Sequence, residues 1–192
     1  MDADDRLEPD AVARLVAALE ASDADVATPN GRTFGDEQRP LVTMPVTRRR
    51  LRANNCLVYA SLYRRELWQR VGGYRPTDPA GYEDWDFWLS ALEHGARFAR
   101  CAEPLFLYRK HGPSMLASAD RQAMRLFATI QSRHPALYPS WRVRLARRVL
   151  AAGEHVGPWL QLGMMATFLL DRRLRLFVRQ LLALRATNML ST

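Results

Sequence analysis

The sequence predicts an α/β domain followed by an α-helical C-terminal region. Up to about residue 118, short apolar runs typical of strands alternate with segments of helical periodicity. From residue 119 onward only helical segments are expected, and prolines separate them. We therefore expect a domain over residues 1–118 and a helical tail over residues 119–192.

The distribution of charge divides the chain at nearly the same place. The 192 residues carry 28 Lys+Arg and 20 Asp+Glu, for a formal net charge of +8. Residues 1–120 have a balance of −2, whereas residues 121–192 hold 12 basic and 2 acidic side chains. We therefore expect a globular first part and a basic tail that is attracted to anionic surfaces.

Composition excludes several classes of protein. A hydrophobic content of 48% excludes global disorder. Lys110 is the single lysine among the basic residues, which indicates a coding bias towards arginine and not phosphate recognition, so no nucleic-acid partner is expected. Cys56 and Cys101 form no CxxC pair. No signal peptide is expected. The expected location is the cytoplasm, with peripheral attachment to the inner face of the membrane as an option.

Individual elements follow from periodicity and from helix start and stop signals. In the first helix, Val12, Leu15, Val16 and Leu19 are spaced i, i+3, i+4, i+7. Gly95 is expected to end the helix predicted over residues 83–94. Residues 29–52, rich in Gly, Pro and Arg, are expected to form a long loop with a strand inside it. Helices are expected over residues 9–21, 64–71 and 83–94, and strands over residues 24–28, 55–63, 98–101 and 105–108.

Acidic residues cluster at the start of the chain, in Asp2-Ala3-Asp4-Asp5. Carboxylates this close repel one another, so a hard cation or abundant solvent must screen them. Taken alone, the cluster is better explained as a solvated stretch before a helix N-terminus, where the helix dipole favours Asp.

Three further motifs follow this cluster: Val71-Gly72-Gly73-Tyr74, Glu83-Asp84-Trp85-Asp86, and Tyr108-Arg109-Lys110-His111. In order and spacing, the four motifs resemble the second half of a family-2 glycosyltransferase catalytic domain of the GT-A type, with a Rossmann-like fold. The resemblance extends from Asp2 to about Ser114. It implies transfer of a sugar, with inversion, from a nucleoside-diphosphate sugar to a hydroxyl of a saccharide or lipid-linked acceptor.

The resemblance also implies a divalent cation, Mg²⁺ or Mn²⁺, that binds the diphosphate. Asp4 would be the principal ligand, Asp2 would bind the metal or the ribose, and His111 would complete the metal shell. Asp5 would contribute to substrate binding or would cap the following helix. Arg109 and Lys110 would neutralise phosphate charge.

Asp84 matches the aspartate that acts as general base in this family, and its position at a predicted helix start suits an ionised carboxylate. Glu83 would assist in substrate binding, and Trp85 would stack on an acceptor sugar. Gly73 would let the backbone approach the ligand closely. The structural alternatives are acidic first-turn residues for the pair Glu83-Asp84, core packing for Trp85, and a helix C-cap for Gly73.

The part of the family's domain that binds the nucleotide base has no counterpart in this sequence. We therefore expect the chain to be inactive alone and to need an N-terminal half, which a separate chain could supply. The alternative is a non-catalytic fragment whose basic helices bind a membrane or a partner chain.

The tail alternates apolar and basic residues in two stretches, as do helices that lie on anionic membranes. The alternative is a helix pair that packs on the domain with its arginines in solvent. The first stretch contains Trp141, Arg142, Val143, Arg144, Leu145, Arg147, Arg148, Val149 and Leu150. The second contains Leu169, Leu170, Arg172, Arg173, Leu174, Arg175, Phe177, Arg179, Leu181 and Leu182.

Overall fold

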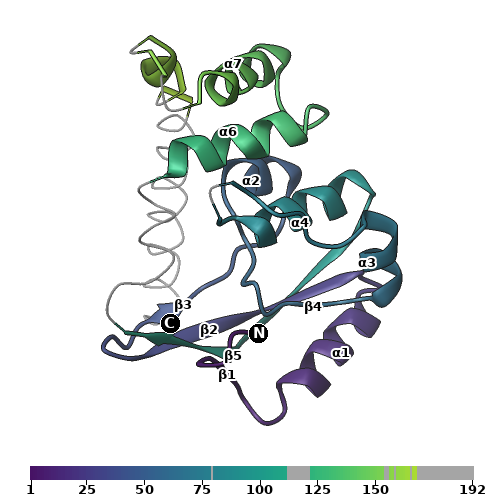
Figure 1. Ribbon diagram of the computed structural model, residues 1–192. Coiled ribbons are helices and arrows are strands. Elements are labelled where there is room, and N and C mark those ends of the chain that lie inside the picture. Colours follow the sequence, from purple (N-terminus) through teal and green to yellow (C-terminus); the bar gives the residue numbers. More distant parts are fainter. Residues whose placement is uncertain (79, 112–121, 154–155, 158, 165, 168–192) are drawn as a thin grey trace, which may run out of the picture.

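The structure is a computed structural model that describes residues 1–78, 80–111, 122–153, 156–157, 159–164 and 166–167 (Figure 1). Its strands are β1 (Arg6–Leu7), β2 (Val26–Gly35), β3 (Pro40–Leu41), β4 (Leu62–Tyr63) and β5 (Phe98–Lys110). Its helices are α1 (Ala11–Ala21), α2 (Arg48–Ala53), α3 (Arg65–Val71), α4 (Glu83–Glu93), α6 (Ala123–Arg133) and α7 (Ser140–Ala151). The predicted α/β fold with a helical C-terminal region is confirmed.

Two long parallel strands, β2 and β5, form the centre of the sheet. The strand order is β1-β5-β2-β3, and the short β4 pairs antiparallel with β2. From the sequence, two separate strands were expected in place of β5, and the strand that corresponds to β2 was expected to end at residue 28. The ladder instead continues past Pro29 and Pro104, because a register irregularity at Asn30 lets the two strands pair again as far as Gly35 and Lys110.

Helices cover both faces of the sheet (Figure 1). On one face, Leu15 and Leu19 of α1 pack over Ala27 of β2 and Leu105 of β5. On the other face, Val26 belongs to the core formed by the remaining helices. The side chains of the neighbouring residues Val26 and Ala27 therefore pack on opposite faces of the sheet, as the two-residue period of a strand requires.

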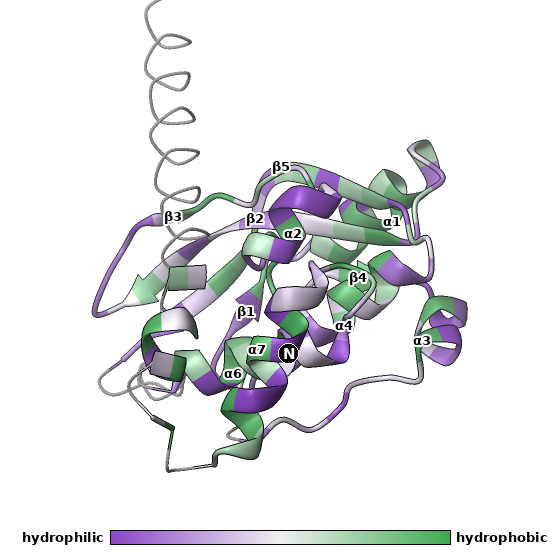
Figure 2. Cartoon of the chain, turned by 90° about the horizontal axis from the view of Figure 1, so that it is seen from above, coloured by the Kyte–Doolittle hydropathy of each residue, from purple (hydrophilic) through white to green (hydrophobic). Residues whose placement is uncertain are grey.

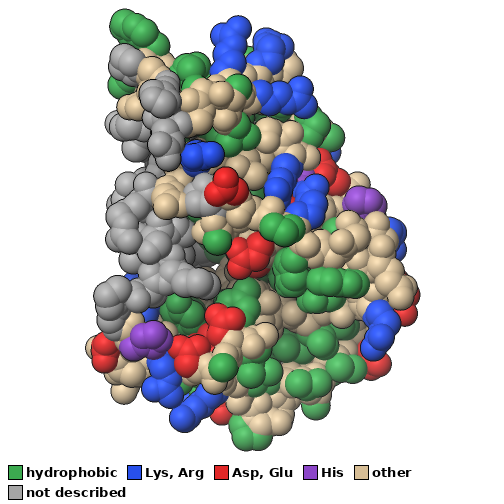
Figure 3. Space-filling view, in the orientation of Figure 1, with side chains coloured by type: hydrophobic (Ala, Val, Ile, Leu, Met, Phe, Trp, Pro, Cys, Tyr) green, Lys and Arg blue, Asp and Glu red, His purple; other side chains and the backbone are tan. Residues whose placement is uncertain are grey.

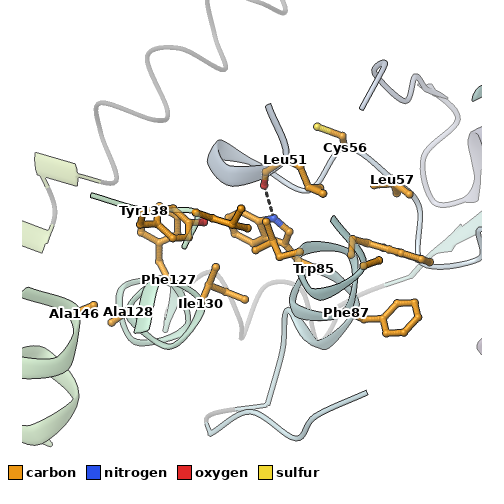
Figure 4. Close-up of a cluster of buried hydrophobic side chains, with 14 of the residues drawn as sticks. Leu51, Cys56, Leu57, Trp85, Phe87, Phe127, Ala128, Ile130, Tyr138 and Ala146 are labelled. Atoms are coloured by element: carbon orange, nitrogen blue, oxygen red, sulfur yellow. Dashed lines mark hydrogen bonds between the residues drawn. The ribbon is translucent and has the colours of Figure 1, made fainter. Parts of the chain in front are cut away.

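The larger core is built around the ring of Trp85, at the start of α4 (Figure 4). Its indole Nε1 donates to the carbonyl of Leu51 in α2 at 2.7 Å, and its ring stacks with Phe127 of α6 at 5.9 Å between centroids. Tyr138, before α7, donates its hydroxyl to the carbonyl of Arg52. Figure 2 shows green, apolar segments of α6 and α7 beside α4. Helices far apart in the sequence thus share one core.

A cluster of charged and polar side chains around the buried Asp86 also joins α6 to α4. Asp86, on α4, is 1% exposed and binds Arg75 through both carboxylate oxygens, at 2.7 and 2.9 Å. His134, at the end of α6, lies 3.1 Å from Asp86 and 2.7 Å from Glu93, and Arg133 lies 3.4 Å from Asp86. Burial favours a raised pKa for Asp86, but the hydrogen bonds from His134 and Arg75 outweigh it and hold that pKa below its usual value.

The described part of the tail packs on the domain. Val143, Ala146 and Val149 of α7 are buried in the larger core, whereas Trp141, which the sequence grouped with them, is 50% exposed. For the apolar face of α7 the packing alternative is therefore the one observed. The second basic stretch and the predicted boundary at residue 118 lie outside the described residues, and the division into two domains stays a prediction.

No helix among the described residues combines the length and the apolar character needed to cross a bilayer.

Candidate functional site

The acidic cluster lies beside the end of β5, because β1 pairs with that strand immediately after Asp5. Asp5 is buried, and its carboxylate accepts hydrogen bonds from the Tyr59 hydroxyl and from the backbone N–H of Arg109, the latter at 2.7 Å. The residue at the N-cap position of α1 is Asp10. The predicted helix-capping role of Asp5 is therefore wrong, because its carboxylate instead anchors the N-terminus to β5.

Asp4 and His111 come together, although 107 positions separate them in the sequence. Nε2 of His111 lies 3.0 Å from Oδ2 of Asp4, and both side chains are exposed. Arg109 donates through Nε to the carbonyl of Asp4 at 3.1 Å. Asp2 is also exposed, and its backbone nitrogen contacts the Tyr59 hydroxyl at 3.3 Å. The structure thus brings Asp4 and His111 together as a pair.

The described part of the chain contains no group of three or more His, Cys, Asp or Glu residues that could hold a metal ion. The site predicted from Asp2, Asp4 and His111 is therefore reduced to the Asp4–His111 pair.

Aromatic rings surround the basic residues at the end of β5. The guanidinium of Arg109 lies 4.6 Å from the ring centre of Phe34, and Nζ of Lys110 lies 5.3 Å from that of Tyr108. Burial, with smaller contributions from the carboxylates of Asp5, Asp2 and Asp4, raises the pKa of Tyr108. Figure 3 shows a histidine at the lower left of the molecule, with acidic and basic side chains near it.

Asp84 occupies the first turn of α4, as predicted, and is half-buried. Its Oδ1 accepts from the backbone N–H of Trp85 at 2.7 Å, and its Oδ2 accepts from Nδ2 of Asn55 at 2.7 Å. Burial raises the pKa of Asp84 to about 6, with the charge of Glu83 as a smaller contribution. A carboxylate with such a pKa is ionised at neutral pH and is a stronger base than an ordinary aspartate.

One short segment connects Asp84 to the acidic cluster. Asn55 holds Asp84, and Tyr59, four residues later, holds Asp5. Four residues span at most about 14 Å, so the two groups of carboxylates lie near the same part of the molecule. Neither residue was predicted to belong to the site, because residues 55–63 have the pattern of a plain strand. Only the last two of these residues are in β4.

Two predicted binding residues are structural. Trp85 is 4% exposed and packs in the core, so its ring has no free face for a sugar. Gly73 has φ of +75° and its Cα faces the ring of Trp68 so closely that a Cβ would lie 2.6 Å from Trp68 Cζ2. Gly72, at φ of +84°, is the C-cap of α3. Core packing and helix termination therefore explain these residues, while Glu83 is exposed and its binding role stays a prediction.

We expect the side-chain carboxyl of Asp84 to titrate near pH 6 in a ¹³C NMR experiment, because burial raises its pKa. Asn55→Ala removes a hydrogen bond that favours the charged form, so it should move this pKa further upward. Glu83→Gln, at the exposed neighbour, removes a negative charge and should lower it slightly. Titration of Asp84 at its ordinary value of about 4 would show that the carboxyl is solvated.

No family model matches the sequence, and the search of curated proteins found no match. Solved structures do match. The S. aureus TarS 1–349 complex with UDP-GlcNAc is 17% identical, with a TM-score of 0.53 over 76% of this chain and 45% of that chain. A second structure of S. aureus TarS 1–349 is 14% identical, with a TM-score of 0.51 over 89% of this chain and 54% of that chain.

This chain spans about half the length of the solved structures it matches. At this identity the likeness concerns the fold alone. The chain has a glycosyltransferase-like fold.

Proposed function

We propose that this chain supplies the acceptor side and the diphosphate side of a glycosyltransferase that uses a nucleoside-diphosphate sugar. The observation that supports this most directly is Asp84, a half-buried carboxylate at a helix start whose pKa is raised to about 6. The likeness to a structure that contains UDP-GlcNAc is consistent with a donor of that class.

In the proposed reaction, the acceptor hydroxyl oxygen bonds to the anomeric carbon as the bond from that carbon to the diphosphate oxygen breaks. The hydroxyl proton passes to Asp84. Each oxygen of this carboxylate accepts one hydrogen bond, from Trp85 or Asn55, and retains another lone pair for the incoming proton. These two bonds also fix the direction of the carboxylate, which is the geometric requirement for a general base.

The diphosphate leaves with additional negative charge. Arg109 and Lys110, the last two residues of β5, bring two positive charges to the end of the sheet where the acidic cluster lies. Charge-assisted hydrogen bonds to phosphate oxygens are roughly twice as strong as neutral ones. These two residues are therefore proposed to stabilise the departing diphosphate.

A divalent cation fits the Asp4–His111 pair in the chemistry of its donors. One carboxylate and one imidazole suit Mn²⁺, and they leave coordination positions for phosphate oxygens and water. Asp5 does not fit as a ligand, because its carboxylate is buried and is held against Tyr59 and Arg109, whereas Asp4 and His111 are exposed. When bound, the cation would act as a Lewis acid towards the diphosphate.

Addition of Mn²⁺ is expected to broaden the NMR signals of His111 and of the residues around Asp4, because a paramagnetic ion relaxes nearby nuclei. Asp4→Ala should abolish the effect. His94 is an internal control, since its Nδ1 contacts the carbonyl of Ser90 at 2.8 Å, within α4 and away from the acidic cluster. Equal broadening of His94 and His111 would mean non-specific binding and would exclude the proposed metal pair.

Sugar transfer itself is tested in the complete enzyme, where this chain is present with the nucleotide-binding part. Turnover of a nucleoside-diphosphate sugar is expected to fall severely in Asp4→Ala and to stop in excess chelator. Undiminished turnover in chelator would remove the metal from the proposal, and turnover independent of Asp84 would remove the proposed base.

A further inference from the structure

The outward face of α7 and the helical residues next to it form an exposed surface that is both basic and aromatic. We define this α7 surface by Trp141, Arg144, Arg147, Arg148, Trp159 and Leu162. Figure 3 shows basic side chains crowded at the top of the molecule, where Figure 1 places α7.

Among the described residues, no acidic side chain pairs with the arginines of this surface. Residues 122–153 contain six arginines and no Asp or Glu. Arg144, Arg147 and Arg148 are exposed, and none of them forms an ion pair with another residue that the structure describes. By contrast, Arg133 is bound to the buried Asp86. Three neighbouring arginines on α7 are therefore available to an anionic partner.

Large apolar side chains stand beside these arginines. Trp159 is 84% exposed, Leu162 is 56% exposed and Trp141 is 50% exposed. Trp141, Arg144 and Arg148 share one face of α7, because they are spaced i, i+3, i+7. Trp159 and Leu162 belong to helical residues 159–164, which pack against α7 where Gly163 meets Leu145. Tryptophan in water is unusual, whereas it is enriched at the interface of bilayers.

We propose that the α7 surface docks on an anionic lipid bilayer, with the arginines on lipid phosphates and the two tryptophans in the interfacial region. In this arrangement the buried face of α7, with Val143 and Val149, stays in the protein core. The protein therefore docks as a folded unit through its outward face, and α7 does not turn its apolar side to the membrane.

The aromatic half of the surface favours a bilayer over a nucleic acid. Phosphates of a duplex would satisfy the arginines but would leave Leu162 and Trp159 in water. A bilayer interface satisfies both, since anionic lipid attracts arginine and the interfacial region accepts tryptophan and leucine. The proposal does not rest on the proposed sugar transfer, because it concerns binding alone.

The test is co-sedimentation of the whole chain with vesicles of phosphatidylcholine containing 30% phosphatidylglycerol. Binding is expected at low salt, and it should weaken in high salt and on pure phosphatidylcholine, because screening and loss of lipid charge act on the same arginines. Each arginine near an anionic surface contributes about fivefold in affinity, so Arg144→Gln/Arg148→Gln should weaken binding about 30-fold. Trp159→Ser should weaken it as well.

The matched control is Arg65→Gln/Arg70→Gln, which removes the same charge from α3, away from α7 (Figure 1). This control should change vesicle binding less than threefold. Equal losses in the two double variants would show that only net charge matters and would overturn the α7 surface. The proposal also fails if Trp159→Ser leaves vesicle binding unchanged, or if the chain binds a DNA duplex but ignores the vesicles.

Discussion

Asp84→Asn is expected to lower the kcat of the complete enzyme by about 10²–10⁴-fold, the usual scale for a general base, with donor affinity nearly unchanged. Asparagine keeps the shape of the side chain but cannot take the proton of the acceptor hydroxyl. The measurement is steady-state transfer with calorimetric donor binding in parallel. A matched loss of donor affinity would indicate a structural or metal role for Asp84.

The same substitution should stabilise the fold above pH 7. The pKa of Asp84 is about 6 in the folded protein against an ordinary value of 3.8, so the folded form binds more protons between these values. The free energy of unfolding of the native sequence therefore falls as pH rises through this window. Because asparagine carries no charge, Asp84→Asn should gain about 1–3 kcal/mol at pH 7.5, and the gain should vanish near pH 4.

Urea denaturation at both pH values checks this prediction, with Glu83→Gln as the control. Glu83 is the exposed neighbour, and its substitution should change stability by about 0.5 kcal/mol or less. A variant that is less stable at pH 7.5 would mean that the charge of Asp84 holds the fold together. A stabilised but inactive variant is the signature of a functional carboxylate kept at a cost in stability.

Asp86→Ala is expected to destabilise the protein by about 3–5 kcal/mol. The substitution removes the buried carboxylate that the guanidinium of Arg75 and the fully buried His134 share, and leaves His134 with Glu93 alone. Arg75 remains partly in solvent, so the lower end of that range is expected. Urea unfolding measures the loss directly.

Asp78→Ala is the control for this experiment, since Asp78 is 96% exposed and lies 4.0 Å from Arg125. It should cost about 0.5 kcal/mol or less. A cost below about 1 kcal/mol for Asp86→Ala would show that the hydrophobic core holds α6 on α4 without the ion pairs.

Two acidic residues of α4, two positions apart, thus have different environments, and the sequence alone did not separate them. Asp84 has a raised pKa because burial dominates, whereas Asp86 has a lowered pKa because His134 and Arg75 outweigh burial. His134 lies 48 positions after Asp86, beyond the reach of any local pattern. Only the packing of α6 on α4 decides which of the two carboxylates is a candidate base.

Features that depend on contacts between residues close in the sequence could be predicted from the sequence alone. Periodicity located α1, α3 and α4, Gly72 ended α3, and Asp84 was placed in the first turn of α4. These features follow from contacts within one or two helical turns, which a linear pattern records.

Features that depend on contacts between residues far apart in the sequence could be seen only in the tertiary structure. The continuous β5 needs β2 beside it, and α2, inside a predicted loop, is fixed partly by the bond from Trp85 to Leu51. Asp5 became an anchor and Trp85 a core residue because their partners are distant in the sequence. Trp141 is likewise exposed because α7 packs on the core with its opposite face, which a local pattern does not specify. A local pattern encodes which residues are apolar or charged, but burial is set by the segments that pack against them.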